Sequence, residues 1–228
     1  MKVTAVNVGC GSNVCELPGW ENIDNSPGLW LSKHSLIRRV SGWAGLVPEG
    51  VASVAWPRCV RVHNAARGLP YADSSLLYVY ASHFLEHLPL GAARHFLREC
   101  FRVLRACGIL RVVVPDLGLH CHRYMMAALE SPSDDELNAD RFLRGTCLGA
   151  DDVAEHAWAR ALRRLLARDR HHWMYDEGSL IAKFREAGFA RVVRRSFRES
   201  LIPDINLLDI PARASESLYV EGQKLVDR

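Results

Sequence analysis

Two glycines and an acidic residue near the start of the chain have the spacing of a nucleotide site. Gly9 and Gly11 follow an apolar run, and Asp24 ends the next one. Glycines at such a turn let the backbone approach a ligand closely. A carboxylate at the end of the second run can accept two hydrogen bonds from ribose hydroxyls. The dinucleotide fingerprint needs a third glycine where this chain has Val14. We therefore expect a nucleoside without a pyrophosphate; the alternative is an ordinary turn in which Asp24 is only a turn residue.

Three further residues are candidates for acid–base chemistry. His83 and Asp116 directly follow two strongly apolar runs, and His171 precedes the last predicted helix. The carboxyl ends of buried parallel strands face the ligand crevice of an open α/β sheet, and a positioned base contributes roughly 10²–10⁴-fold to rate. We expect His83, Asp116 and His171 at the site as bases or substrate anchors. We expect His87 in the core, bonded to a backbone group or a carboxylate, and leave Glu86 open.

Two histidine sets could be interpreted as metal ligands. His171 and His172 with Asp176 form one, but adjacent side chains diverge and seldom hold one ion, so we expect Asp176 to cap its helix. The His-Cys-His run at residues 120–122 matches no established zinc spacing, and a polar helix face is the simpler interpretation. The sequence therefore predicts no metal site.

Periodicity predicts the elements that must position these residues. The segment between Gly11 and Trp20 is too short for a full crossover helix and should be one turn or irregular. Strands alternate with helical segments, which predicts a doubly wound, mostly parallel, Rossmann-like α/β sheet whose last two strands form an antiparallel edge. Strands are expected at Val3–Val8, Glu21–Asp24, Val60–His63, Leu76–Ala81, Ile109–Val114, Arg191–Phe197 and Glu216–Glu221, and helices at Leu29–Val47, Leu90–Leu104 and Asp176–Ala187.

Residues 117–170 break this alternation because they are almost wholly helical in character. We expect them to form a helical insert, or lid, over the carboxyl ends of the strands, within a single domain that spans residues 1–228. The Arg-rich run at residues 157–170 has leucines at helical spacing and is expected to be a solvated amphipathic helix.

Composition excludes several classes of protein. The chain has 228 residues, of which 49% are hydrophobic and 24% charged, and a net charge of +3 that favours neither nucleic acid nor membrane. Seven scattered cysteines without a Cys-x-x-Cys pair indicate reduced thiols, and there is no signal-peptide pattern or run long enough to span a bilayer. We expect a cytoplasmic protein; its oligomeric state is left open.

Several segments together resemble the class I S-adenosylmethionine-dependent methyltransferases. They are "VNVGCGSNVCELPGWENID", "LPYADSSLLYVYASHFLEHLP", "ECFRVLRACGILRVVVPD", "HHWMYDEGSLIAKFREAGF" and "SLYVEGQK". The resemblance covers nearly the whole chain and is greatest to the small branch with the pattern GCG, a short loop, GW and N-[VI]-D. It departs where the family's Lys-Pro-Gly-Gly turn is here Arg-Ala-Cys-Gly at residues 105–108.

This resemblance implies a cofactor site for S-adenosylmethionine. Gly9, Cys10 and Gly11 would line its methionine part, and Asp24 would bind its ribose. At the adenine, Asn64 and Ala65 take the place of the family's acid and small residue; the amide keeps an acceptor but loses the charge. Ser82 and His83 would flank the sulfonium.

Three functions compete at this point. We favour methyl transfer to an oxygen or nitrogen of a small-molecule acceptor such as a sugar, a glycan or a secondary metabolite. A nucleic-acid or protein methyltransferase is the first alternative; the chain shows neither a basic face nor the Asn-Pro-Pro-Tyr-like tetrapeptide of enzymes that methylate amino groups in nucleic acids. A non-catalytic cofactor-binding regulatory domain is the second.

Overall fold

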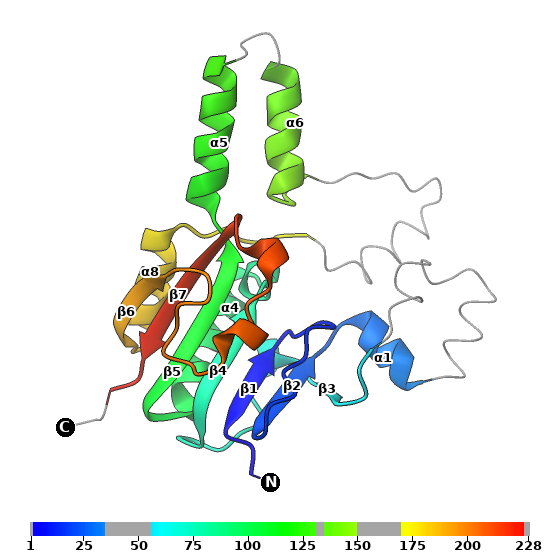
Figure 1. Cartoon of the computed structure of the whole chain (residues 1–228), viewed down its shortest axis with the longest axis vertical. Helices are drawn as coiled ribbons and strands as arrows, with labels where there is room; N and C mark the ends of the chain where they lie inside the picture. Colours follow the sequence, from blue (N-terminus) through cyan, green and yellow to red (C-terminus); the bar gives the residue numbers. More distant parts are fainter. Residues whose placement is uncertain (1, 35–55, 131–134, 150–169, 226–228) are drawn as a thin grey trace.

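The computed structural model describes residues 2–34, 56–130, 135–149 and 170–225. Its centre is a seven-stranded sheet with the strand order β3-β2-β1-β4-β5-β7-β6 (Figure 1). The strands are β1 (Ala5–Val8), β2 (Trp20–Asp24), β3 (Val60–Val62), β4 (Leu76–Ser82), β5 (Leu104–Pro115), β6 (Ala190–Arg195) and β7 (Ser217–Gln223).

The first five strands of the sheet are parallel, and the last two form an antiparallel edge. β7 pairs antiparallel with β5 and also with β6, whereas β1, β2, β3, β4 and β5 pair parallel with their neighbours. The order reverses at β1, which lies between β2 and β4. This confirms the predicted Rossmann-like fold with an antiparallel edge, and it places the topological switch point, where such sheets bind ligands, at the end of β1.

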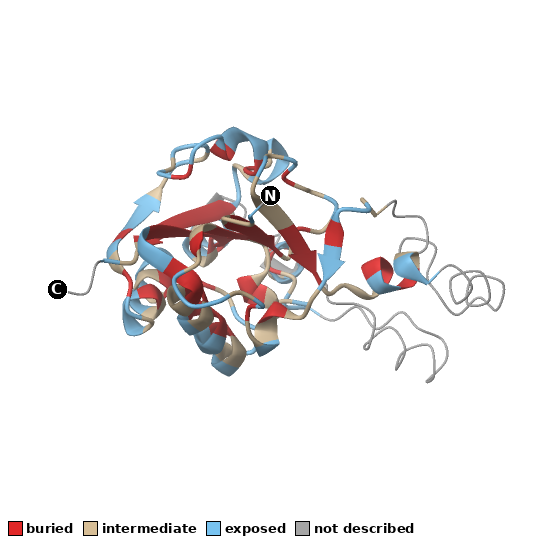
Figure 2. Cartoon of the chain, turned by 90° about the horizontal axis from the view of Figure 1, so that it is seen from below, coloured by how far each residue is buried: buried red, intermediate tan, exposed pale blue. Residues whose placement is uncertain are grey.

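The two faces of the sheet are covered differently. On one face α4 (Leu90–Val103) and α8 (Glu177–Glu186) pack on alternate residues of the strands, with Phe96 and Phe184 fully buried between them. The opposite face is covered by short 3-10 segments, chiefly η4 (Ile205–Leu207). Buried residues are concentrated in the central strands when the molecule is viewed along the sheet (Figure 2).

Side-chain amides replace the missing first crossover helix. No helix forms between β1 and β2, as predicted. Instead Asn22 Oδ1 accepts from the Cys15 backbone N–H at 2.8 Å, and its Nδ2 donates to Cys15 O at 2.9 Å. Asn7 Nδ2 donates to Asn13 O at 2.9 Å. Because these amides are buried, they fix the glycine loop without regular structure.

The remaining helices are α1 (Pro27–Lys33), α5 (Leu117–Glu130) and α6 (Asp135–Gly145). α5 and α6 lie side by side and project beyond the end of β5 (Figure 1). The part of the predicted insert at residues 150–169, most of the Arg-rich run and most of the helix expected at Leu29–Val47 lie outside the described residues. None of the helices in the described ranges is long and apolar enough to cross a membrane.

The structure differs from the sequence prediction at β5, which begins at Leu104 and not at Ile109. Leu104 pairs with Leu76 and Ile109 with Tyr78, so the four residues 105–108 of β5 lie opposite the single residue Leu77 of β4. Cys107 adopts a φ of +63° within this irregular stretch. The Arg-Ala-Cys-Gly sequence therefore forms a bulged extension of the strand, in which the exposed residues 105–107 have no apolar periodicity to reveal it.

Candidate functional site

A cavity of about 690 Å³ opens at the carboxyl ends of β1, β2 and β4. This volume is within the roughly 300–1,000 Å³ of small-molecule sites. All eight residues that were predicted to bind a cofactor line it: Gly9, Cys10, Gly11, Asp24, Asn64, Ala65, Ser82 and His83. These residues come from four separate segments that the sheet brings together at its switch point.

Both glycines at the end of β1 have backbone conformations that disfavour a side chain. Gly9 has a φ of +64° and Gly11 a φ of +56°. A Cβ on Gly9 would lie 2.7 Å from Cδ2 of Phe84, whereas a Cβ on Gly11 would meet nothing within 4 Å. Because Gly9 has no side chain, Phe84, which follows β4, can pack closely against it. Gly11 leaves its backbone open to the cavity.

Asp24 joins the glycine loop to the start of α1. Its Oδ2 accepts from the Gly11 N–H at 3.0 Å, and its Oδ1 accepts from the Ser26 N–H at 2.6 Å. Each carboxylate oxygen can accept more than one hydrogen bond, so capacity for ligand hydroxyls remains. The neighbouring Cys10 is buried, and burial together with the negative charge of Asp24 raises its pKa to about 12, so the thiol stays neutral.

Two polar atoms near Asp24 and Asn64 in the cavity lining have no hydrogen-bond partner. Ser26 Oγ and Trp56 Nε1 are buried without a hydrogen bond, and both residues line the cavity. Such groups are costly unless a ligand or water satisfies them. Asn64 Oδ1 caps η1 (Ala65–Arg67) by accepting from Ala66 N at 3.2 Å. A polar ligand with donors and acceptors, such as a nucleoside, fits this set of residues.

His83 turns the chain at the end of β4. Its φ of +50° lies in the left-handed region, which costs on the order of 1–3 kcal/mol for a non-glycine residue. The N–H of His83 donates to Val113 O at 2.8 Å, and Nε2 lies 2.9 Å from Ser217 Oγ. Its Nδ1 lies 3.3 Å from Glu86 Oε1. The imidazole is therefore held between a hydroxyl and a carboxylate at the wall of the cavity.

Asp116 and Asp176 lie at helix starts. Asp116 is buried, and its oxygens contact the Leu119 N–H at 3.3 Å and Arg194 at 3.4 Å. It is not among the residues that line the cavity. Asp176 forms a capping box with Ser179 at the start of α8, as predicted, and these hydrogen bonds lower its pKa.

His87 and His171 lie side by side in the structure. His87 lines the cavity and is only half-buried, so its predicted place in the core is wrong, although its predicted backbone bond exists: Nδ1 lies 3.2 Å from Arg170 O. His171 does not line the cavity and packs edge-on against His87, with ring centroids 5.0 Å apart. Its pKa is lowered, chiefly by burial.

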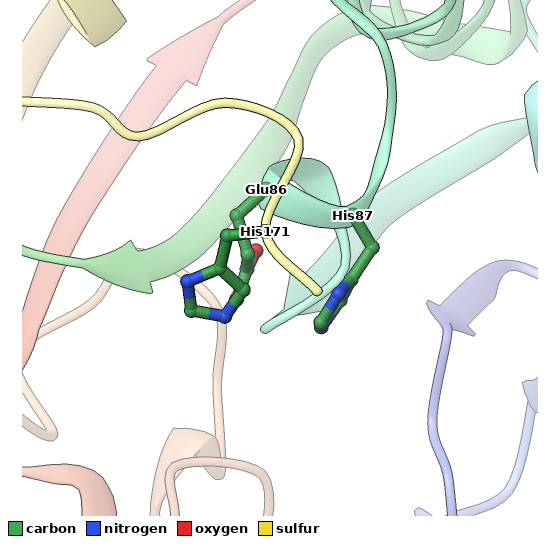
Figure 3. A group of neighbouring side chains, drawn as sticks. All are labelled: Glu86, His87 and His171. Atoms are coloured by element: carbon green, nitrogen blue, oxygen red, sulfur yellow. The ribbon is translucent and has the colours of Figure 1, made fainter. Parts of the chain in front are cut away.

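Glu86 lies beside these two rings and is fully buried (Figure 3). Neither carboxylate oxygen has a hydrogen-bond partner. Glu86, His87 and His171 each offer an atom that lies within 4.8 Å of those of the other two, and they form a group that could hold a metal ion within the described residues. The histidines at 120 and 122 join no such group there; His120 is buried in α5, contrary to the expected polar face.

Several lining residues were missed by sequence reasoning. Trp56 and Ser26 are in loops whose patterns contain no motif, and the exposed arginines Arg170 and Arg213 come from distant segments. Only the fold brings them to the cavity. Of the histidines that line the cavity, His83 was predicted at the site and His87 was not.

The comparisons with known proteins agree with the fold. The methyltransferase domain family matches residues 46–112. An Archaeoglobus fulgidus S-adenosylmethionine-dependent methyltransferase is similar in structure, with a TM-score of 0.50 and 12% identity over 98% of this chain and 86% of that chain. A Methanosarcina mazei protein of the same description has a TM-score of 0.49 and 18% identity over 99% and 94% of the two chains. At these identities the likeness concerns the fold. No curated protein matches the sequence.

The family match covers the segment from which Asn64, Ser82 and His83 come, and the sheet is mostly parallel with the predicted antiparallel edge. Taken with the glycine loop and Asp24 at the switch point, these findings agree with the resemblance to the class I S-adenosylmethionine-dependent methyltransferases.

Proposed function

We propose that this protein transfers a methyl group from S-adenosylmethionine to an oxygen or nitrogen of a small-molecule acceptor. The observation that carries the proposal is the convergence of all eight expected cofactor residues on one cavity, whose other end is lined by histidines and arginines. When bound, the cofactor supplies an already activated methyl group, so the protein's task is mainly alignment, worth about 7–11 kcal/mol.

In this proposal the glycine loop and Asp24 hold the nucleoside end. Asp24 accepts the ribose hydroxyls while keeping the loop in place through the Gly11 N–H. Asn64 and Ala65 lie beside the base, and Trp56 Nε1 and Ser26 Oγ supply two hydrogen-bonding groups that the protein itself leaves without partners.

The acceptor end is formed by His83, His87 and His172, with Arg170 and Arg213 exposed at the rim. His83 is the proposed base, because its imidazole lines the cavity and is held in place by Ser217 Oγ at Nε2 and by Glu86 Oε1 at Nδ1. The two guanidinium groups favour an acceptor with anionic or hydroxyl-rich groups. Because they do not line the cavity, we propose supporting roles for Asp116, at the start of α5, and for His171, behind His87.

The test is a turnover screen with isotopically labelled S-adenosylmethionine. Pools of sugars and glycosides, phenols, carboxylates and amines are incubated with the protein, alongside bulk tRNA and a protein extract, and products are identified by mass. We expect label in a small molecule and a turnover rate at least about 100-fold lower for His83→Gln. Label found only in tRNA or protein would contradict the proposed acceptor class, and an unchanged rate for His83→Gln would contradict the assigned base.

A further inference from the structure

Glu86 is a buried acid without compensation. Its side chain is 0% exposed, and neither Oε1 nor Oε2 has a hydrogen-bond partner. His83 Nδ1 lies 3.3 Å from Oε1, which is longer than the 2.7–2.9 Å typical of charge-assisted bonds. Burying a carboxylate in this way is costly, so a group that completes it is expected.

His87 presents a free nitrogen in the same place. The backbone carbonyl of Arg170 can only accept a hydrogen bond, so His87 Nδ1, 3.2 Å away, must carry the proton and donate it. In the neutral ring this leaves the lone pair on Nε2 available. A histidine that donates one ring N–H to a backbone carbonyl has the usual orientation of a metal ligand.

The loop that brings in His171 is fixed to Glu86 itself. The backbone N–H groups of His172 and Trp173 both donate to Glu86 O, at 2.8 and 3.2 Å, and the N–H of His171 donates to Cys147 O at 3.3 Å. Two rings and a carboxylate from segments 85 residues apart are thus held together (Figure 3). His171 Nδ1 is itself buried without a hydrogen-bond partner.

We propose that Glu86, His87 and His171 bind a divalent transition-metal cation at the acceptor end of the cavity. Two imidazole nitrogens and one carboxylate oxygen suit Zn²⁺ and its neighbours better than Mg²⁺ or Ca²⁺, which prefer oxygen ligands. Ligand atoms around a tetrahedral ion stand about 3.4 Å apart, so the present spacing of up to 4.8 Å closes by small side-chain rotations.

Three protein ligands leave a coordination position open, as in catalytic zinc sites. His87 lines the cavity, so this position faces the space in which the acceptor is proposed to bind. If the proposed function holds, the cation would hold an acceptor oxygen or nitrogen beside the methyl donor. The metal site itself requires no methyl transfer.

A buried water is the competing explanation. Tyr175 Oη is also buried without a partner, and one water between this hydroxyl and the Glu86 carboxylate would satisfy both. A water between Tyr175 and Glu86 would leave the Nε2 lone pair of His87 without a function. Metal binding distinguishes the two explanations directly.

The experiment is a titration of metal-free protein with Co²⁺, followed by its visible d–d absorption. Several cysteines are exposed, and Co²⁺ reports thiolate binding by a separate near-ultraviolet charge-transfer band. We expect one equivalent to bind without that band and to be displaced by Zn²⁺. Glu86→Gln, His87→Gln and His171→Gln should each weaken binding at least tenfold. His172→Gln is the matched control, because His172 adjoins His171 and lines the cavity outside the group, and it should change affinity less than threefold.

The proposal fails if wild-type protein binds no Co²⁺, if binding shows the thiolate band, or if the three variants bind as His172→Gln does. Thermal denaturation of each variant and a parallel titration with S-adenosylhomocysteine show that the cavity is folded. If the wild-type protein binds S-adenosylhomocysteine but not Co²⁺, the metal site is overturned and the proposed methyl transfer stands. If the wild-type protein binds neither, the result counts against the proposed function as well.

Discussion

Two groups of buried charge in this molecule are built in opposite ways. Arg111, on the face of β5 covered by η4, is fully buried, and all five of its N–H groups donate: to Asp209, Glu221 and the backbone oxygens of Ser196 and Glu199. Glu86, behind the cavity, accepts no hydrogen bond at all. Buried charges that serve only the fold are expected to be paired within it, so the difference marks Glu86 as a group that is completed by something else.

The acids around Arg111 confirm how complete that cluster is. Asp209 also accepts from Tyr80 Oη at 3.1 Å and from the Arg198 N–H at 2.9 Å. Glu221 accepts from Ser200 Oγ, from the Leu201 N–H at 3.1 Å and from Arg195 Nε at 3.3 Å. The cluster joins β5 and β7 to the loops that cover this face, and no part of it lines the cavity apart from Tyr80.

The largest expected effect is on stability at the paired cluster. Arg111→Met removes the only fully buried cation among the described residues and takes from the buried acids Asp209 and Glu221 the charge on which both converge. We expect the free energy of unfolding to fall by about 3–5 kcal/mol, measured by urea denaturation. Arg195→Met is the control: its side chain is partly exposed and the loss should stay near 1 kcal/mol or below. Equal losses for the two variants would show that Arg111 is not the centre of the cluster.

A smaller effect, different in the two groups, is expected when the acids are neutralised. Glu221→Gln gives up charge-assisted bonds and should cost about 1.5–3 kcal/mol. Glu86→Gln removes a charge that has no hydrogen bond, so the metal-free protein should stay within about 1 kcal/mol of wild type or become more stable. Urea denaturation of both variants in the presence of a chelator makes the comparison. A loss at Glu86→Gln as large as at Glu221→Gln would mean that Glu86 is paired within the fold, and the contrast would disappear.

The fold and the nucleoside end of the cavity could be predicted from sequence because their determinants are local. Gly9, Gly11 and Asp24 lie within sixteen consecutive residues, and apolar runs mark β4 and the core of β5. The positions of His87 and His171 could not be, because they depend on where the chain returns after the α5–α6 segment. No local pattern shows which of these two rings faces the cavity. Their placement depends on the hydrogen bonds that the His172 and Trp173 N–H groups donate to Glu86 O.

Other missed features have the same origin. The buried amides Asn7 and Asn22 hold the glycine loop, yet an asparagine within a strand carries no pattern that predicts its partner. Asp116 lies at the end of its strand, as predicted, but its side chain contacts the start of α5 and Arg194. Strand position predicts which edge a residue occupies and not where its side chain points.

The most direct test of the account is calorimetric titration with S-adenosylhomocysteine. Wild-type protein should bind one equivalent and show no heat with NAD. Asp24→Asn should weaken binding at least tenfold in a protein that still denatures cooperatively, because a charge-assisted acceptor contributes about 1.5–3 kcal/mol. Binding of NAD in place of S-adenosylhomocysteine, or an affinity unchanged by Asp24→Asn, would contradict the assignment of this cavity to the methyl donor.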